Sequence, residues 1–434
     1  MRRAALAAPV LAAVAGCPAL AQEAVQAPEP TAPLTATISQ SFELDTNYGL
    51  DDPSPGTSYY GDTRVALDYI DQTDTTSFGL GIDTGLRPLW EADEDFDLVL
   101  ASPSRAYLAF SQEGADTFFD ATFRLRSRRV DSILGIDDID IGENPDLIDE
   151  QEEGETREQR TDANIGFALG TNSPSTYEFR LRASDFDYAD LDETSRDPRR
   201  SVEGEATWTL DITPVLSTIA SAGYSLSTTD NEADREVREA SADAGLVFQP
   251  SDTLRVRGGI GFAERTEEET LASGARVTEE DSGPLVRADF RYNLPDFTIN
   301  GNARFTTAAP QNRLTGTVRA LYTLPRGRVR AQAFQRYSGS GGDDKITGAG
   351  IGIERDINTI SRVGLDFTYA VQEELETDEP EVERTDLTAS YIYDLTEQVS
   401  AEMGYGYRRR IEDPDDADSH RVFLVIGRTF ETGL

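Results

Sequence analysis

Arginine supplies nearly all of the positive charge of this 434-residue chain, because Lys345 is the only lysine among its 40 basic residues. Many arginines follow one another at a spacing of two, as Arg255 and Arg257 do. In an extended strand that spacing places both side chains on one face. A guanidinium presents a planar fork of donors that matches carboxylate and phosphate groups. Such rows would either bind anions or pair with acidic residues on the same face.

We predict that these arginines face a water-filled interior and form a wall that selects anions. The candidate lining residues are Arg124, Arg126, Arg180, Arg182, Arg255, Arg257, Arg287, Arg291, Arg304, Arg319, Arg328, Arg330 and Arg362. The alternative is that they only hold the wall together by pairing with acids of the same rows, such as Asp120, Glu178, Asp289 and Asp366. The two interpretations carry equal weight on the sequence.

The sequence offers no catalytic or metal-binding group of residues. Its only histidine, His420, follows Ser419 directly, and neighbouring residues of a strand point to opposite faces, so they would not meet as base and nucleophile. We find no phosphate-binding loop, no HExxH motif and no cysteine cluster. Basic residues do not gather with aromatic ones in a contiguous patch, which argues against a nucleic-acid partner. We therefore expect no enzyme activity, no cofactor and no metal.

The elements that would position the arginines are β-strands of period two. Between Val399 and Arg408 every second residue is apolar, and the residues between them are polar or glycine. The same alternation, typical of a strand with one apolar face, recurs along the chain. Strand centres are expected near residues 40, 67, 81, 108, 123, 166, 181, 207, 220, 244, 258, 288, 301, 318, 331, 350, 365, 389, 404 and 425.

Two kinds of connection alternate between these strands. Short turns such as DQTDT, NLPD and DLTEQ alternate with longer charged loops, including Thr266–Gly283 and Ile411–Ser419. Acidic residues outnumber basic ones by 80 to 40 and concentrate in the long loops. A transmembrane barrel keeps its short turns at the periplasmic end and its long loops outside. The longest loop, Val130–Gln159, would either fold inward opposite Arg255 or Arg328 or extend from the surface.

The N-terminus has the features of a secretory signal. Residues 1–21 start with two arginines, continue with a short apolar stretch and end in a cleavage site after Ala21. A lipoprotein signal that would leave Cys17 lipidated is the alternative. Residues 22–33 are expected to be a flexible periplasmic lead, residues 34–430 the barrel, and residues 431–434 a short tail. No plug domain is expected before the barrel, which argues against an energised siderophore receptor.

Taken together, these features resemble Gram-negative outer-membrane β-barrel proteins, similar to porins and to the porin-like barrels associated with exopolysaccharide export. The resemblance is carried by the signal peptide, the alternating strands and connections, and the last strand HRVFLVIGRTF, which ends at Phe430. It implies an all-β fold, a transmembrane antiparallel up-and-down barrel of about 20 strands (18–22), in the cell outer membrane. It also implies that Phe430 is the signal for the outer-membrane assembly machinery, although four residues follow it.

The expected function is that of an outer-membrane channel for passive diffusion or export of hydrophilic, preferentially anionic, solutes. The alternatives are a barrel that secretes an acidic exopolysaccharide and a structural or surface-adhesion barrel with acidic outer loops. The expected partners are outer-membrane lipid and lipopolysaccharide, the assembly machinery, and hydrophilic solutes or polysaccharide. A secreted all-β protein would explain the net charge of −40 and the mean hydropathy of −0.47, but not the alternation of connections. The sequence leaves the oligomeric state open.

Overall fold

The computed structural model describes residues 34–48, 50, 53–90, 96–101, 103–129, 157–189, 198–229, 235–270, 275–308, 312–338, 344–375, 381–412 and 414–432. Within these ranges, no helix is long and apolar enough to cross a bilayer. The predicted signal peptide with Cys17 and the predicted lead 22–33 lie outside the described residues. So do residues 130–156 of the longest predicted loop, which would either fold inward or extend from the surface, whereas residues 157–159 begin a strand.

The regular elements of the described residues are all strands. They are β1 (Leu34–Asp45), β2 (Ser58–Tyr60), β3 (Thr63–Gln72), β4 (Thr76–Trp90), β5 (Asp97–Leu100), β6 (Ser104–Glu113), β7 (Thr117–Arg129), β8 (Arg157–Leu169), β9 (Ser175–Ala189), β10 (Arg199–Thr213), β11 (Leu216–Thr229), β12 (Arg235–Ser251), β13 (Leu254–Thr270), β14 (Arg276–Leu294), β15 (Phe297–Thr306), β16 (Arg313–Leu324), β17 (Gly327–Ser338), β18 (Asp344–Asn358), β19 (Ser361–Glu374), β20 (Val382–Asp394), β21 (Val399–Glu412) and β22 (Asp415–Thr432).

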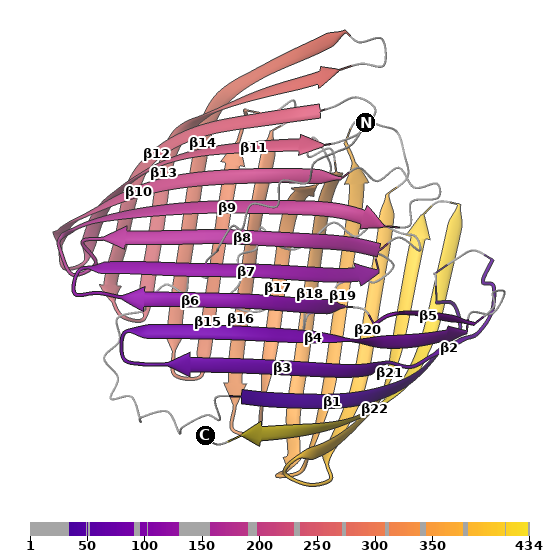
Figure 1. Ribbon diagram of the computed structural model, residues 1–434. Helices are drawn as coiled ribbons and strands as arrows, with labels where there is room; N and C mark the ends of the chain where they lie inside the picture. The colour runs from indigo at the N-terminus through magenta and orange to yellow at the C-terminus, as the bar shows by residue number, and fades with distance from the viewer. Residues whose placement is uncertain are drawn as a thin grey trace, which may run out of the picture.

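These strands form a closed antiparallel barrel (Figure 1). Each wall strand pairs with the next one along the chain, and β22 pairs with β1 over the register from Leu34–Thr432 to Asp45–Arg421. β2 continues β3, since Tyr60 pairs with Glu43 of β1 and Leu89 of β4, and β5 continues β6 along β4 in the same way. The wall therefore has 20 strands, which confirms the predicted fold.

Each of the 20 expected strand centres lies within a different wall strand. The predicted loops, however, were too long. β13 runs to Thr270 and β14 starts at Arg276, which leaves only a few residues of the predicted loop Thr266–Gly283, and β22 extends through Thr432 into the predicted tail. Backbone pairing continues past the point at which the outward residues turn from apolar to charged, so a search for apolar rows stops too early.

The outward row of β13 shows where the wall contacts lipid. Val256, Ile260 and Phe262 are exposed, and Ile260 presents 73% of its surface. The next outward residue is Glu264, and polar or charged residues, Thr266, Glu268 and Thr270, occupy the outward positions beyond it. Apolar rows of this kind occur on most wall strands. Such a continuous apolar surface suits hydrocarbon, in which only a closed sheet or a helix satisfies every backbone polar group.

Candidate functional site

The strand register places every predicted arginine on the same face of the sheet. Directly paired residues of neighbouring strands share a face, so the register can be followed around the barrel. It links Arg124 to Asp162, Arg182 to Glu203, and Arg255 to Arg291, and none of the predicted arginines lies in the exposed apolar rows. The predicted arginines on this face are Arg124, Arg126, Arg180, Arg182, Arg255, Arg257, Arg287, Arg291, Arg304, Arg319, Arg328, Arg330 and Arg362.

This face is the inner one. Arg287 on β14 reaches Glu205 on β10 at 3.0 Å between Nη1 and Oε1, although three strands lie between them. Side chains can bridge that many strands only across the concave side of a closed sheet. The inner face therefore carries the predicted arginines, and the outer face carries the apolar rows.

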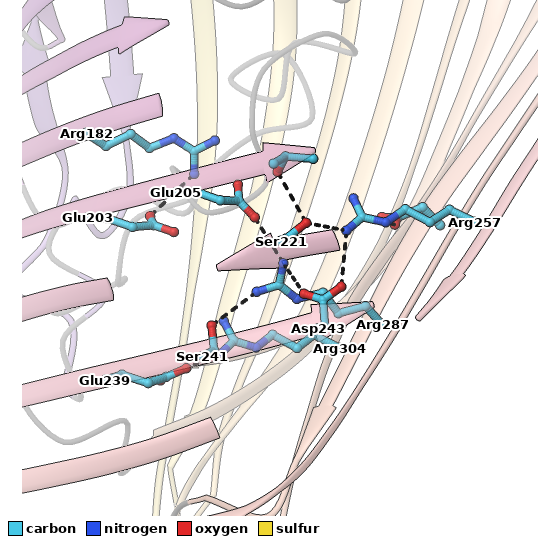
Figure 2. Close-up of polar contacts among 12 residues, drawn as sticks. Arg182, Glu203, Glu205, Ser221, Glu239, Ser241, Asp243, Arg257, Arg287 and Arg304 are labelled. Carbon is cyan, nitrogen blue, oxygen red and sulfur yellow. Dashed lines mark hydrogen bonds and ion pairs between the residues drawn. The ribbon is translucent and has the colours of Figure 1, made fainter. Parts of the chain in front are cut away.

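One group of inner side chains, which we call the wall network, is centred on Asp243 of β12 (Figure 2). The Asp243 side chain is only 1% exposed, and its two carboxylate oxygens lie 3.1 Å from Arg287 Nη1 and 3.5 Å from Arg257 Nη2. Both arginines remain partly exposed, at 18% and 20%. A carboxylate that is almost buried thus holds two guanidinium groups whose other edges reach the lumen. The wall network comprises Arg182, Glu203, Glu205, Ser221, Glu239, Ser241, Asp243, Arg257, Arg287, Asp289 and Arg304.

Further contacts tie this group to the neighbouring strands. Arg257 donates to Ser221 Oγ at 3.2 Å and lies 3.7 Å from Asp289 Oδ2. Arg304 pairs with Glu239, again over more than one strand. Every described arginine of the network thus has an acidic partner.

Glycines on the inner rows make room for these carboxylates. A Cβ on Gly259 would lie 3.2 Å from Asp243 Oδ2, and one on Gly352 would lie 2.4 Å from Asp366 Oδ1. In both places the missing side chain lets an aspartate of the neighbouring strand lie close to the glycine and reach an arginine. At the second place that arginine is Arg330, whose Nη2 donates to Asp366 at 3.3 Å.

Several of the predicted pairings are present. Asp289 pairs with Arg257, Asp366 with Arg330, and Glu178 with Arg180 at 3.6 Å. Asp120 differs, because its Oδ2 atom is buried and has no hydrogen-bond partner among the described residues. Part of the predicted arginine set therefore pairs with acids of the same face, as the alternative interpretation expects.

Two predicted arginines stand apart. Arg255 and Arg291 are exposed and directly opposite one another on β13 and β14. Neither forms an ion pair within 4 Å with any residue that the structure describes. Their guanidinium groups are accordingly available to a solute on the inner side of the wall.

A second group, near the seam where β22 meets β1, was missed in the sequence. Arg87 of β4 makes a bidentate ion pair with Asp62, at 2.7 and 2.9 Å, and donates to the Tyr48 hydroxyl at 2.9 Å. Its guanidinium also lies 4.6 Å from the centre of the Tyr60 ring, which packs edge-on against Tyr48. All of these residues are buried.

The same group extends to the last two strands. Arg408 of β21 pairs with Asp45 at 2.7 Å and donates to the Tyr48 carbonyl oxygen at 3.2 Å. Ser419 of β22 donates to the other Asp45 oxygen. The connection between β1 and β2 therefore lies against the inner wall at Tyr48. We call Asp45, Tyr48, Tyr60, Asp62, Arg87, Arg408 and Ser419 the seam cluster.

The signal for Arg87 was present in the sequence. Asp83, Gly85 and Arg87 continue the polar inner row of β4 at period two. The residues from Leu89 to Pro103, directly after this row, were predicted to form one of the long charged loops. Nothing local indicates that Tyr48 and Asp62, which lie on either side of the predicted loop Asp51–Gly56, turn inward to meet Arg87.

Two other predicted positions can be located. Ser419 points inward to Asp45. His420 lies on the outer face, where its Nδ1 atom and the Tyr405 hydroxyl form a hydrogen bond of 2.6 Å. Phe430 lies opposite Ala36 on the outer face near the end of β22, with the Arg428 guanidinium 4.6 Å from its ring centre. Its part in assembly stays a prediction.

No protein-family model matches the chain, and no curated protein matches it. Among solved structures, the siderophore receptor PirA from Pseudomonas aeruginosa is similar with a TM-score of 0.45 and 11% identity, over 93% of this chain and 81% of that one. The receptor Fiu from E. coli K12 scores 0.47 with 12% identity over 93% and 82%, and the ferric citrate transporter FecA scores 0.49 with 9% over 91% and 78%.

The fold is established by the strand pairing and closure described above. The narrower likeness to porin-like barrels of exopolysaccharide export stays a prediction. A closed antiparallel barrel with apolar outer rows and a charged inner face is the architecture that spans the Gram-negative outer membrane. The chain is an outer-membrane β-barrel of the Gram-negative type.

Proposed function

We propose that the protein is an outer-membrane channel for passive diffusion or export of hydrophilic, preferentially anionic, solutes. The observation that carries this proposal is the separation of side chains between the two faces of the wall. Exposed apolar residues such as Ile260 face outward, whereas every predicted arginine faces inward. A polar inner face needs water, since burying unpaired charge in a dry interior is costly.

Anion preference is supported by the exposed arginines. In a chain with 80 acidic residues, Arg255 and Arg291 have no acidic partner within 4 Å among the described residues. Arg257 and Arg287 share Asp243 and keep part of their surface free. A hydrated anion that moves along β13 and β14 would therefore meet positive charge on the wall. The predicted lining role of the whole arginine set is part of this proposal.

The proposed partners follow from the same surfaces. The apolar outer rows would contact outer-membrane lipid, and the charged outward residues beyond them would meet lipopolysaccharide. The last strand, with Phe430 on its outer face, is the proposed signal for the assembly machinery. We propose no catalytic role: Ser419 and His420 point to opposite faces, so they do not form a nucleophile and base.

The test is ion conductance of the refolded protein in planar lipid bilayers. Discrete conductance steps, with a reversal potential in a KCl gradient that indicates chloride preference, are the expected result. Absence of steps would contradict the channel and favour the structural or adhesion barrel. Steps that show a preference for cations would keep the channel and reject the anion preference. Secretion of an acidic polysaccharide would need the same conducting lumen, and a block by added acidic polysaccharide would favour it.

A further inference from the structure

One cross-strand row of the inner wall carries donors and no acid. Following the register from β13 to β17, Arg255 pairs with Arg291, Arg291 with Asn300, Asn300 with Arg319, and Arg319 with Gln332. We call these five residues the donor row. Three are arginines and two are amides, so five adjacent strands present N–H groups side by side at one line of the wall.

The two ends of the donor row differ in exposure. Arg255 and Arg291 are exposed on the inner side, while Arg319 and Gln332 are buried against the wall at 7% and 8%. The Gln332 Nε2 atom is buried and has no hydrogen-bond partner among the described residues. A buried donor without a partner is costly and calls for an explanation such as an absent ligand or water.

The nearest acids on the adjoining rows are already engaged. Asp289 lies two residues before Arg291 on β14 and pairs with Arg257. Asp366 pairs with Arg330. Like charges directly opposite one another destabilise a sheet. The Arg255–Arg291 pair therefore keeps a repulsion that the wall network avoids by placing Asp243 between Arg257 and Arg287.

We propose that the donor row is a binding site for a multiply charged oxyanion, with phosphate or sulfate as the chemical class. Two guanidinium forks on neighbouring strands can share one tetrahedral anion, and a remaining oxygen can accept from the amide of Asn300 on the next strand. Arg255 is the second residue of β13, close to its short turn, so the site lies near the periplasmic mouth of the barrel. The proposal deepens the channel function and rests on a water-filled lumen.

The test uses the refolded full chain and inorganic phosphate. Equilibrium binding in detergent is measured for the wild type, for Arg255→Gln/Arg291→Gln, and for Arg200→Gln/Arg409→Gln. The last variant removes the same charge from outward positions that pair with Asp185 and Asp416. We expect phosphate to bind the wild type and the control with the same affinity. Its affinity for Arg255→Gln/Arg291→Gln should be lower by about tenfold or more. Chloride, which has a single charge and no separate oxygen atoms to pair with each fork, should compete poorly.

Conductance separates failure of the site from failure of the channel. If the protein conducts but phosphate binds equally to all three proteins, or to none, the donor row is not an oxyanion site and the channel stands. If phosphate binding is lost only in Arg255→Gln/Arg291→Gln while bilayers stay silent, the site stands and the channel fails. In a conducting protein, added phosphate should also reduce the chloride current of the wild type and leave that of the inner-face variant unchanged.

Discussion

The seam cluster and the wall network use the same residue types for different purposes. Both combine arginine with aspartate on the inner face of the barrel. In the seam cluster the pair Arg87–Asp62 is 9% and 7% exposed and is covered by two tyrosines. In the wall network Asp243 is buried even more deeply, at 1%, but Arg257 and Arg287 reach the lumen. The two regions therefore differ in coverage, that is, in how far neighbouring side chains shield the ion pairs from water, and not in residue type.

Coverage decides what a charge pair can do. A buried, bidentate pair such as Arg87–Asp62 has no surface left for a solute, and loss of one partner leaves a charge without water. A pair at the lumen wall is screened by solvent, so it contributes less to stability and its outer edge stays available to ions. The seam cluster should therefore set the stability of the closed barrel, and the wall network should set which ions pass.

The largest effect is expected from Arg87→Ala. It leaves Asp62 buried and unpaired and removes the donor to Tyr48, so the free energy of unfolding should fall by about 3–5 kcal/mol. Urea-dependent unfolding in lipid vesicles, followed by fluorescence of the two tryptophans, measures it. The matched control is Arg328→Ala, whose pair with Glu354 is 49% and 26% exposed and should cost below about 1 kcal/mol. Equal losses for both variants would show that burial of an ion pair does not decide its contribution to the stability of this barrel.

A double replacement sharpens this test. Arg87→Met together with Asp62→Leu removes both charges, so no unpaired carboxylate stays in the seam cluster. Most of the loss seen for Arg87→Ala should then be recovered, because hydrophobic replacement of a buried ion pair is often close to neutral. A double variant as unstable as the single one would mean that Arg87 acts through shape and ring contact instead of charge.

The contrast between the regions also explains how far the sequence could predict them. Period two is a local property, so strand centres and faces were predictable, as the opposite orientations of Ser419 and His420 illustrate. The partners of the arginines were not. Arg287 meets Glu205 because of strand order, register and curvature, and no spacing in the chain encodes a contact across three intervening strands.

Irregular backbone was the second limit on what the sequence could predict. The seam cluster depends on the connection between β1 and β2, where Leu50 adopts a positive φ of 56° and Asn47 donates to Asp45 at 3.0 Å. Such a loop folds onto the wall because Arg87 and Arg408 are there to receive it. Its conformation therefore follows from tertiary contacts, and alternation of residue types gives no information about it.

In the wall network, Asp243→Asn should change ion selectivity more than stability. The substitution removes the negative charge shared by Arg257 and Arg287, so the wall becomes more positive and the reversal potential should shift toward chloride. Because water can reach both arginines, the loss of stability should be about 2 kcal/mol, below that of Arg87→Ala. An unchanged reversal potential would show that ions do not pass this part of the wall.

Tyr48→Phe probes the seam cluster with a smaller change. It keeps the ring contact with Tyr60 and removes only the hydroxyl that accepts from Arg87. A loss of about 1 kcal/mol in unfolding free energy is expected, with no change in ion selectivity. A clear change in selectivity would instead indicate that this inward segment lines the path of the ions.

The smallest effect is expected at the outer rim, where Arg409 and Asp416 form an exposed pair beyond the apolar rows at 2.6 Å. The hydrogen bond from Arg409 lowers the pKa of Asp416. A carboxyl group whose pKa is lower in the folded than in the unfolded protein stabilises the folded state at pH values above the unfolded pKa. This contribution is lost as the pH falls below about 4. Hydrogen exchange at the β21–β22 tip should therefore show more protection in the wild type than in Arg409→Gln at pH 6, and equal protection at pH 2. A difference that persists at pH 2 would mean that Arg409 orders the rim without the charge of Asp416, and coverage would then matter less there than at the seam.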